Sequence, residues 1–423
     1  MASLSILNSE SDEENWVIQI NQMSSETNHS ILKKIPVCIY QVPKSLRSAK
    51  PEAFAPQLIA IGPYNHFCPE LYPMERFKVL SAKAVLDHFQ KHDLKQVVEE
   101  FRNTATFIRA SYHKYLDLKD ETLLYTVAID ALFLLNFYHN YLNDKFSGSF
   151  MAGLEDRVQL RGVKLTKDAI IRDILMVENQ IPTYSLLKIL VHQSSEPAHL
   201  VQDYLGSMLL SFCRQHSPLN LTHVPSYSEA VSKHHHVLDL MYHLVVSHAE
   251  KSETPIPGQS EGMYKLFDDI LYLPVLKLDV NSEVIMRNLV AYEALTKPDF
   301  LIFTRYTELM REIVDTVEDV KLLKKAGIIE SSSSLSVQET EELFNGMSKS
   351  IGPTKTQKLD ETIKKVNKYY HDKRKTNFFR VLTEYVYKSW KLFTLLATFV
   401  LLAMTAIETF CAAYDCHRYF EPE

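Results

Sequence analysis

Apolar residues recur at helical spacing through most of the chain, between an acidic beginning and an apolar end. This period places one face of each segment against a core and predicts amphipathic helices. The predicted helices cover Glu75–Lys91, Leu94–Leu116, Thr166–Met176, Pro182–Val191, His199–Arg214, Ser228–His248, Val284–Thr296, Asp299–Asp315 and Ser336–Ser350. A last helical stretch, Leu359–Trp390, carries an apolar stripe and is predicted to serve as a stalk.

The most apolar internal segment, Thr122–Leu142, is interrupted by Asp130, Asn136 and His139. A carboxylate in the middle of a span is costly in lipid. We therefore expect this segment to be the central buried helix of a soluble bundle and not a membrane helix.

Two stretches have the composition and alternation of strands: Val37–Val42 and Tyr272–Val280. We expect them to pair in a small sheet.

The polar, breaker-rich segments 194–197, 250–261 and 330–334 are predicted loops, and 250–261 is the best candidate for a boundary between two subdomains. Ser336 and Glu339 form a predicted capping box. The predicted fold is mainly α: a large helical, bundle-like soluble domain with minor short strands, plus a C-terminal transmembrane helix.

The apolar end of the chain is uncharged from Leu392 to Ile407 and continues, after Glu408, to Tyr414. A helix needs about 20 apolar residues to cross a bilayer. The sequence therefore predicts a transmembrane helix over 391–414, with Leu392, Phe399, Leu402 and Ile407 among its anchoring residues. A buried C-terminal core helix is the alternative, but such a helix would show a polar face.

Basic residues are concentrated before this apolar segment, at Lys373, Arg374, Lys375, Arg380, Lys388 and Lys391. Only Arg418 follows it closely. The positive-inside rule then keeps the bulk of the chain in the cytosol, with the plasma membrane as the expected location. The expected parts are an acidic segment over 1–34, a helical domain over 35–390, the membrane helix and a short tail over 415–423.

Composition narrows the classes of function. The 423 residues include only 10 glycines but 22 tyrosines and 21 phenylalanines, which disfavours glycine-rich phosphate loops and β-rich folds. The net charge of −6 gives no general affinity for nucleic acid. Five dispersed cysteines without CxxC spacing do not indicate a disulfide framework or a thiolate zinc site.

A histidine cluster at 234–248 is the most prominent candidate for chemistry. His235, Asp239 and His243 are four residues apart, so on one helix they would share a face that could hold a divalent metal. The alternative is an amphipathic helix with a polar start, and we favour it because HExxH and further ligands are missing. No nucleophile or nucleotide motif is present either. The sequence thus indicates no catalytic residue, no metal, no cofactor and no small-molecule ligand.

Several unusual phrases occur in a fixed order along the chain. They are IPVCIYQVPKSLR (35–47), AFAPQLIAIGPYNH (53–66), MERFK (74–78), AIDALFLLNF (128–137), MVENQIPTYSLLKIL (176–190), HHHVLDLMYHLV (234–245), LPVLKLDVNSEVIMRNLVAYEAL (273–295) and DVKLLKKAGII (319–329). From about Ile35 to its end, the chain resembles the plant family called domain of unknown function 247, or uncharacterised protein family 0481. It departs from that family's usual residues at Asn65, Ala131, Thr183 and Ala294.

The residues that carry this resemblance are expected to have structural roles. They are Gly62, Pro63, Tyr64, His66, Asp130, Glu178, Asn179, Gln180, Pro182, Arg287, Asn288 and Glu293. We expect 178–180 to cap the helix that starts at Pro182 or to pair with a neighbouring loop. Burial of Arg287, Asn288 and Glu293 would require hydrogen bonds among them.

The resemblance implies a membrane-anchored plant protein without established enzymatic activity. It implies a recognition or signalling role through a protein partner, in reproductive control such as self-incompatibility or suppression of female organ development. Two alternatives remain open. One is a cryptic hydrolase or transferase that uses His66, Glu178 or the histidine cluster, and the other is a purely structural membrane tether.

Overall fold

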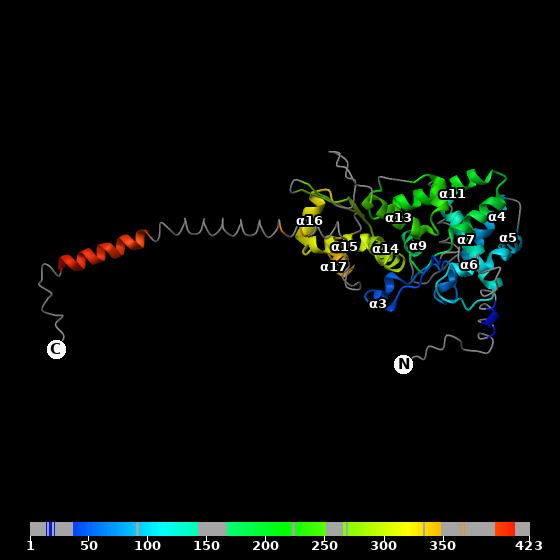
Figure 1. Cartoon of the computed structure of the whole chain (residues 1–423), viewed down its shortest axis with the longest axis horizontal. Helices are drawn as coiled ribbons and strands as arrows, with labels where there is room; N and C mark the ends of the chain where they lie inside the picture. The colour runs from blue at the N-terminus through cyan, green and yellow to red at the C-terminus, as the bar shows by residue number, and fades with distance from the viewer. Residues whose placement is uncertain are drawn as a thin grey trace. The chain divides into compact units, whose positions relative to one another are not determined.

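The computed structural model describes residues 37–89, 93–142, 167–221, 225–250, 265–267, 270–332, 335–347 and 394–410, with isolated positions at 14, 17, 18, 21, 364 and 368. The chain divides into two compact units, one comprising 1–265 and 272–359 and the other 266–271 and 360–423. The described residues are mostly helical, as the hydrophobic pattern predicts (Figure 1). The predicted boundary loop, the stalk and the two terminal segments lie almost wholly outside the described residues.

The centre of the first unit is helix α7, Asp120–Leu142. It contacts α4 (Pro73–Phe89), α5 (Leu94–Phe101), α10 (Thr183–Gln193) and α11 (Ala198–His216). Helices α4, α5 and α11 lie around it in Figure 1. Within the described ranges, α7 is the one helix long and apolar enough to cross a membrane, and most of it is buried. The prediction of a buried central helix is therefore confirmed.

Aromatic side chains fill the contact between α7 and α11. The rings of Phe137, Tyr138 and Tyr141 each lie within 6.0 Å of the Phe212 ring, centroid to centroid, in edge-on arrangements. Such pairs favour the edge-to-face geometry over a stacked one because of the ring quadrupole. Part of the aromatic bulk of the composition is thus core packing between helices.

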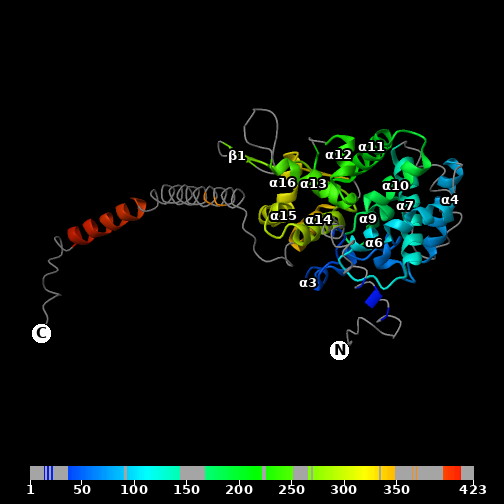
Figure 2. The ribbon, with the colours of Figure 1, turned by 45° about the vertical axis from the view of Figure 1, so that its right-hand side comes forward.

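A second group of helices packs together in the same unit (Figure 2). Its members are α13 (Val237–Glu250), α14 (Ser282–Thr296), α15 (Ile302–Ile313), α16 (Val317–Lys325) and α17 (Val337–Met347). The capping box predicted before α17 is present, since Ser336 Oγ accepts the Glu339 N–H and Glu339 accepts the Ser336 N–H. Helix α16 was not among the predicted helices, and its own capping box joins Thr316 and Asp319.

Shorter elements complete the described secondary structure. The short helices are α3 (Lys44–Arg47), α6 (Ala105–Ala110), α9 (Lys167–Ile174) and α12 (Tyr227–Ser232), with 3-10 turns at Pro51–Ala53, Pro63–Asn65 and Arg102–Thr104. The strands β1 (Lys265–Phe267) and β2 (Ile270–Tyr272) form one two-stranded sheet, and β3 (Leu276–Leu278) and β4 (Ile329–Ser331) form another.

The strand pairing differs from the prediction. β3 pairs in parallel with β4, with Leu276 opposite Ile329, and β4 overlaps the start of the loop predicted over 330–334. Val37–Val42 instead makes one isolated parallel bridge, from Ile39 to Tyr112. The alternation in β3 is as predicted, because Leu276 and Leu278 are buried and Lys277 is exposed. Which strand lies beside which is a long-range property that alternation alone does not specify.

Two predicted helices are broken. Leu94–Leu116 is divided into α5, a 3-10 turn and α6, and it ends at Ala110. Ser228–His248 is divided into α12 and α13 by the segment 233–236. At that break, the Asp239 carboxylate accepts the His235 N–H and His236 Nδ1 accepts the Asp239 N–H. These side chains satisfy the first free backbone donors of a new helix, so α13 starts afresh after them.

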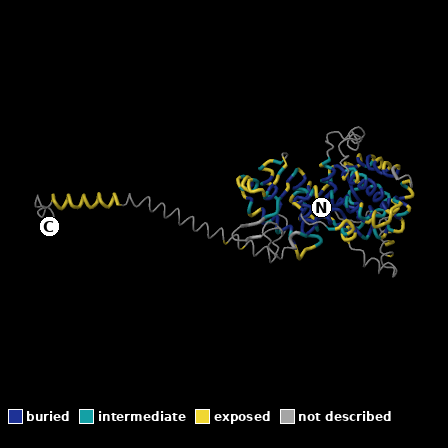
Figure 3. The backbone as a smooth tube through the Cα atoms, turned by 90° about the horizontal axis from the view of Figure 1, so that it is seen from above, coloured by how far each residue is buried: buried dark blue, intermediate teal, exposed yellow. Residues whose placement is uncertain are grey.

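The C-terminal apolar segment is described as a helix over Thr394–Phe410, and all of its residues are exposed (Figure 3). At 1.5 Å per residue its length is about 26 Å, which is short of the roughly 30 Å hydrocarbon thickness of a bilayer. Leu392 lies outside the described residues, whereas Phe399, Leu402 and Ile407 are exposed. The membrane-spanning helix predicted over 391–414 is therefore present only as a short apolar helix.

Candidate functional site

Asp173, on the buried face of α9, holds the start of the irregular segment 57–62. Its Oδ2 accepts the N–H groups of Gln57, Leu58 and Ile59 at 3.1, 2.7 and 3.0 Å. Its Oδ1 accepts from the Arg172 guanidinium at 2.9 Å. Burial raises the pKa of Asp173, and the Arg172 charge and the backbone N–H groups oppose that rise. The Asp173 carboxylate thus accepts hydrogen bonds that a neighbouring β-strand would otherwise accept from this backbone.

Asn179 binds the middle of the same segment. Its Oδ1 accepts the Ile61 N–H at 2.7 Å, and its Nδ2 donates to the Ile59 carbonyl at 2.9 Å. Nδ2 also donates to the Asp173 carbonyl at 2.9 Å. The side chain therefore pairs with the backbone as a β-strand would, and it does so from a loop that lies more than 110 residues further along the chain.

Lys78 and Asp130 hold the end of the segment. Lys78 Nζ donates to the Ala60 carbonyl at 2.8 Å and to Asp130 Oδ1 at 2.5 Å, and Asp130 Oδ2 accepts the Gly62 N–H at 2.7 Å. Glu75 also contacts Lys78 Nζ, at 2.7 Å. Burial raises the pKa of Asp130 to about 6, although the Lys78 charge lowers it. This pair joins α4 to α7 inside the core.

Glu178 connects the loop after α9 to the segment around α3. It forms an ion pair with Arg47, and its Oε1 accepts the Val42 N–H at 2.6 Å. The Glu178 carbonyl accepts from Asn65 Nδ2 at 3.4 Å. The carboxylate is buried and its contacts are structural, so it is not presented to solvent as an acid or base would be.

Gln180 and Pro182 shape the turn that leads into α10. Gln180 Nε2 donates to the carbonyls of Ile174 and Met176 at 2.6 and 2.8 Å, and the Gln180 carbonyl accepts the Tyr112 hydroxyl at 3.0 Å. Pro182 is the residue just before the helix, and no side chain caps this end. Of the two predicted roles for 178–180, capping is wrong and pairing with neighbouring segments is confirmed.

Arg287 and Asn288 lie on α14. The predicted hydrogen bonds among Arg287, Asn288 and Glu293 are not found in the described structure, because each side chain bonds another partner. Arg287 Nε donates to Glu283 at 3.0 Å. Asn288 Oδ1 accepts the Val177 N–H at 2.9 Å, and its Nδ2 donates to the Ala53 carbonyl at 2.8 Å. Asn288 thus joins α14 to the same loop that carries Asn179.

Glu293 caps a different helix. Its carboxylate accepts the N–H groups of Phe303 and Thr304 at 2.8 and 2.7 Å, at the start of α15, and the Tyr242 hydroxyl at 2.9 Å. The residue before α15, Leu301, has no side chain that could do this. Burial raises the pKa of Glu293, and these hydrogen bonds oppose the rise.

The residues Gly62, Pro63 and Tyr64 form a turn at the end of the segment 57–62. Pro63 begins the 3-10 turn, and the Tyr64 hydroxyl accepts the Lys114 N–H at 3.0 Å and donates to the Ile39 carbonyl at 3.2 Å. His66 is partly buried, and its Nδ1 has no hydrogen-bond partner in the part of the chain that the structure describes. Burial lowers the pKa of His66.

The network includes three side chains that the sequence reasoning did not single out: Asp173, Lys78 and Arg47. The sequence does indicate a role for Asp173, because this residue falls among the apolar isoleucines of α9. A buried carboxylate there needs hydrogen-bond partners. Lys78 lies in a motif segment, but its burial depends on Asp130, 52 residues further on. Of the predicted site residues, Asp130, Asn179 and Gln180 come together around Gly62. Glu178, Arg287 and Glu293 lie in other contacts.

The histidine cluster forms a separate site. Its metal-type ligand atoms belong to His234, Asp239 and His243, and all lie within 4.8 Å of one another. His235, a predicted member, is exposed and contributes only its backbone N–H, because helix α13 starts at Val237. His236 is buried, and its Nε2 lies 2.9 Å from the Cys38 carbonyl.

Charge is unevenly distributed in this cluster. Burial lowers the pKa of His234 to about 4. Burial also opposes the charged form of His243, but its bond to Asp239 prevails and raises the pKa. For Asp239, burial favours protonation, yet His243 and His236 bring the pKa well below its ordinary value. Asp239 is therefore an anion held mainly by imidazole rings.

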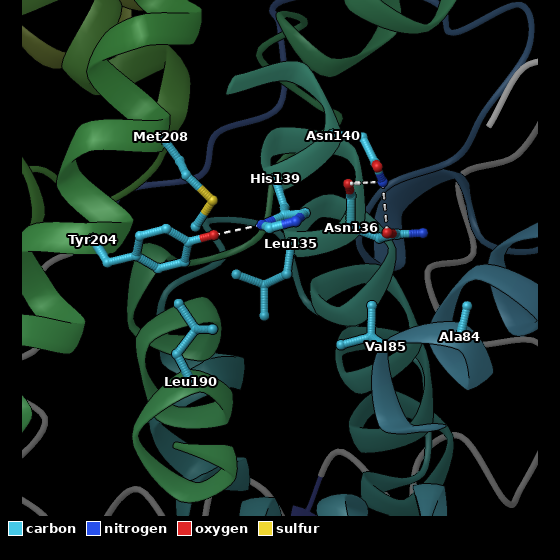
Figure 4. Close-up of a pocket in the computed structure, with 9 residues that line it drawn as sticks. All are labelled: Ala84, Val85, Leu135, Asn136, His139, Asn140, Leu190, Tyr204 and Met208. Atoms are coloured by element: carbon cyan, nitrogen blue, oxygen red, sulfur yellow. Dashed lines mark hydrogen bonds between the residues drawn. The ribbon is translucent and has the colours of Figure 1, made fainter. Parts of the chain in front are cut away.

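A cavity of about 430 Å³ lies between α4, α7, α10 and α11 (Figure 4). His139 Nδ1 bonds the Tyr204 hydroxyl on one side of it, and Asn140 Nδ2 bonds Asn136 on the other. The remaining lining is aliphatic or thioether. Neither polar pair contacts the histidine cluster or the network around 57–62 through a described hydrogen bond.

The cryptic hydrolase or transferase required His66, Glu178 or the histidine cluster to act in a shared pocket. Among the residues described, no hydrogen bond or ion pair joins any two of these groups. Glu178 is committed to Arg47 and Val42. The geometry therefore favours structural roles for the motif residues over a common reaction centre.

Gly62 is the position in the network where we expect a side chain to be strongly destabilising. Its φ is +75°, and a Cβ there would lie 2.5 Å from the Gln180 carbonyl oxygen. Gly327 has a similar φ of +72° but faces open space, so it is a matched control. We expect Gly327→Ala to lower the free energy of unfolding by about 1 kcal/mol and Gly62→Ala by at least about 3 kcal/mol. Urea unfolding measures both, and equal losses would contradict this account.

Comparison with known proteins gives matches that extend over most of the chain. A family model described as a plant protein of unknown function, DUF247, matches residues 39–265 and 263–404. A putative UPF0481 protein of Arabidopsis thaliana is 29% identical over 97% of this chain and 96% of its own length. A second UPF0481 protein of that plant is 26% identical over 39% of this chain and 34% of its own length. No solved structure matches.

The family match covers the loop at 178–180, the segment 57–62 and helix α14, whose side chains build the buried network. It also covers most of the helix over Thr394–Phe410. The chain therefore belongs to the plant family DUF247.

Proposed function

We propose that the chain is a membrane-attached recognition protein, in which a rigid helical body presents a surface to a protein partner. The observation that carries this proposal is the helix over Thr394–Phe410, which is apolar apart from Glu408 and four threonines and is exposed throughout. Phe399 and Leu402 are 70% and 67% exposed. Apolar surface of this extent is unfavourable in water at roughly 25 cal/mol per Å² and calls for lipid or protein to cover it.

The sequence on both sides supports lipid as the covering environment. The uncharged stretch begins at Leu392, and six basic residues precede it from Lys373 onward. Basic residues beside an apolar helix bind the anionic cytoplasmic face of a membrane. In this proposal the bulk of the chain is cytosolic and the plasma membrane is the location.

The body of the protein supports recognition over catalysis. The buried polar side chains of the family motifs are used to hold backbone segments together, as shown by Asp173, Asn179 and Asn288. A scaffold of this kind maintains one surface shape, because buried hydrogen-bonded networks specify a unique packing. Following the resemblance of its motifs, we place this recognition in plant reproductive control, either self-incompatibility or suppression of female organ development.

Membrane attachment is tested by flotation of the full chain with phosphatidylcholine–phosphatidylserine vesicles. The double variant Phe399→Lys/Leu402→Lys places two charges in the middle of the apolar helix, where each costs about 2.5–3.5 kcal/mol in a membrane. We expect this variant to leave the vesicle fraction almost completely. The control Thr394→Lys/Thr409→Lys adds the same charge at the helix ends, where lysine reaches the interface, and should float as the unchanged chain does. Flotation of all three chains alike, or of none, would contradict attachment by this helix.

Recognition by the body is tested in plant membranes with the apolar segment replaced by an unrelated transmembrane helix. We expect the same partner protein to cross-link to the original chain and to the exchanged chain, because the body carries the binding surface. Loss of the partner on exchange would instead assign binding to the apolar segment. Turnover of a small molecule without any partner would overturn the recognition proposal.

A further inference from the structure

The break before α13 brings two histidine rings next to each other, with their planes tilted by 46°. His243 lies one turn after Asp239 on α13, and His234 lies in the segment just before the helix. The ring centroids of His234 and His243 are 4.8 Å apart, and both rings lie beside the Asp239 carboxylate. The arrangement needs the break, because on a continuous helix His235 would take the place of His234.

Two groups besides the imidazole rings also hydrogen-bond the Asp239 carboxylate and orient it. The Tyr292 hydroxyl donates to Asp239 Oδ1 at 2.8 Å, and the His235 N–H donates to Oδ2 at 2.7 Å. Ion pairs of Asp239 in the described residues involve only His234 and His243. A buried, oriented carboxylate whose described ion pairs involve only imidazoles can bind a cation in this position.

The Nδ1 atoms of His234 and His243 are the candidate imidazole ligands for a metal ion beside Asp239. His234 Nδ1 is buried and has no hydrogen-bond partner among the described groups, and it lies 3.9 Å from Asp239 Oδ2. His243 Nδ1 lies 2.8 Å from Asp239 Oδ1 and 2.9 Å from the Asp239 backbone carbonyl oxygen, so a proton on this nitrogen faces both acceptors. A cation can replace that proton, as metal binding to imidazole ordinarily does. The His243 side chain is 42% exposed, which leaves a path from solvent to the cluster.

We propose that His234, Asp239 and His243 bind a divalent transition-metal ion, zinc in the first place, with the remaining coordination position open to solvent. Two imidazoles and one carboxylate suit zinc or iron better than magnesium or calcium, which prefer oxygen ligands. Zinc bonds of about 2.0–2.2 Å require ligand atoms roughly 3.4 Å apart in a tetrahedral site. The ligand atoms now lie within 4.8 Å of one another, so ion binding requires the two histidine side chains to rotate.

The proposal is tested on the purified full chain by calorimetric titration with zinc chloride, and by the visible absorption of bound cobalt(II). We expect one zinc per chain, and affinity at least about tenfold weaker in His234→Gln and in His243→Gln. His235→Gln is the matched control: it changes the adjacent, exposed histidine and should retain affinity within about threefold. Circular dichroism and metal-free urea unfolding establish that each variant is folded.

Three results would overturn the proposal. The first is an unchanged chain that binds neither zinc nor cobalt(II). The second is zinc affinity in folded His234→Gln and His243→Gln equal to that of the unchanged chain, which would assign binding to other histidines of the 17 in the chain. The third is a loss in His235→Gln as large as that in His234→Gln. Because these readouts need no membrane or partner protein, they are independent of the proposed recognition function.

Discussion

The fold depends on how residues 58–62 are satisfied, because they are buried without a strand or helix to pair with. Each unpaired backbone group there would cost about 1–3 kcal/mol. Side chains from four separate elements prevent this: Asp173 on α9, Asn179 on the following loop, Lys78 on α4 and Asp130 on α7. The same contacts fix how those elements meet, so the central helix and the motif loop are ordered together.

In this arrangement, the polar side chains of the most recognisable phrases of the chain make structural contacts. Glutamate, asparagine and glutamine at 178–180 are residue types common in active sites, yet their polar atoms serve backbone groups and Arg47. The histidine cluster is different, because His234 keeps an unused nitrogen beside a buried anion. Structural and ligand-binding polar residues therefore occupy separate places in one body.

The sequence predicted what local periodicity controls and missed what distant contacts control. Helix α7 and the capping box at Ser336 were predictable because apolar spacing and capping chemistry are local. The break at 233–236 has no glycine or proline to mark it and arises from the side chains of His236 and Asp239. The pairing of β3 with β4 joins segments about 50 residues apart. The role of Asp173 depends on a segment more than 110 residues away.

Amide hydrogen exchange tests the central claim most directly, since it reports each backbone N–H of the segment. The N–H groups of Leu58, Ile59, Ile61 and Gly62 lie in a stretch without regular secondary structure, and side chains accept each of them. The account predicts protection comparable to that of amides in the middle of α7, because opening them requires the core to unfold. Exchange as fast as in an exposed loop would contradict it.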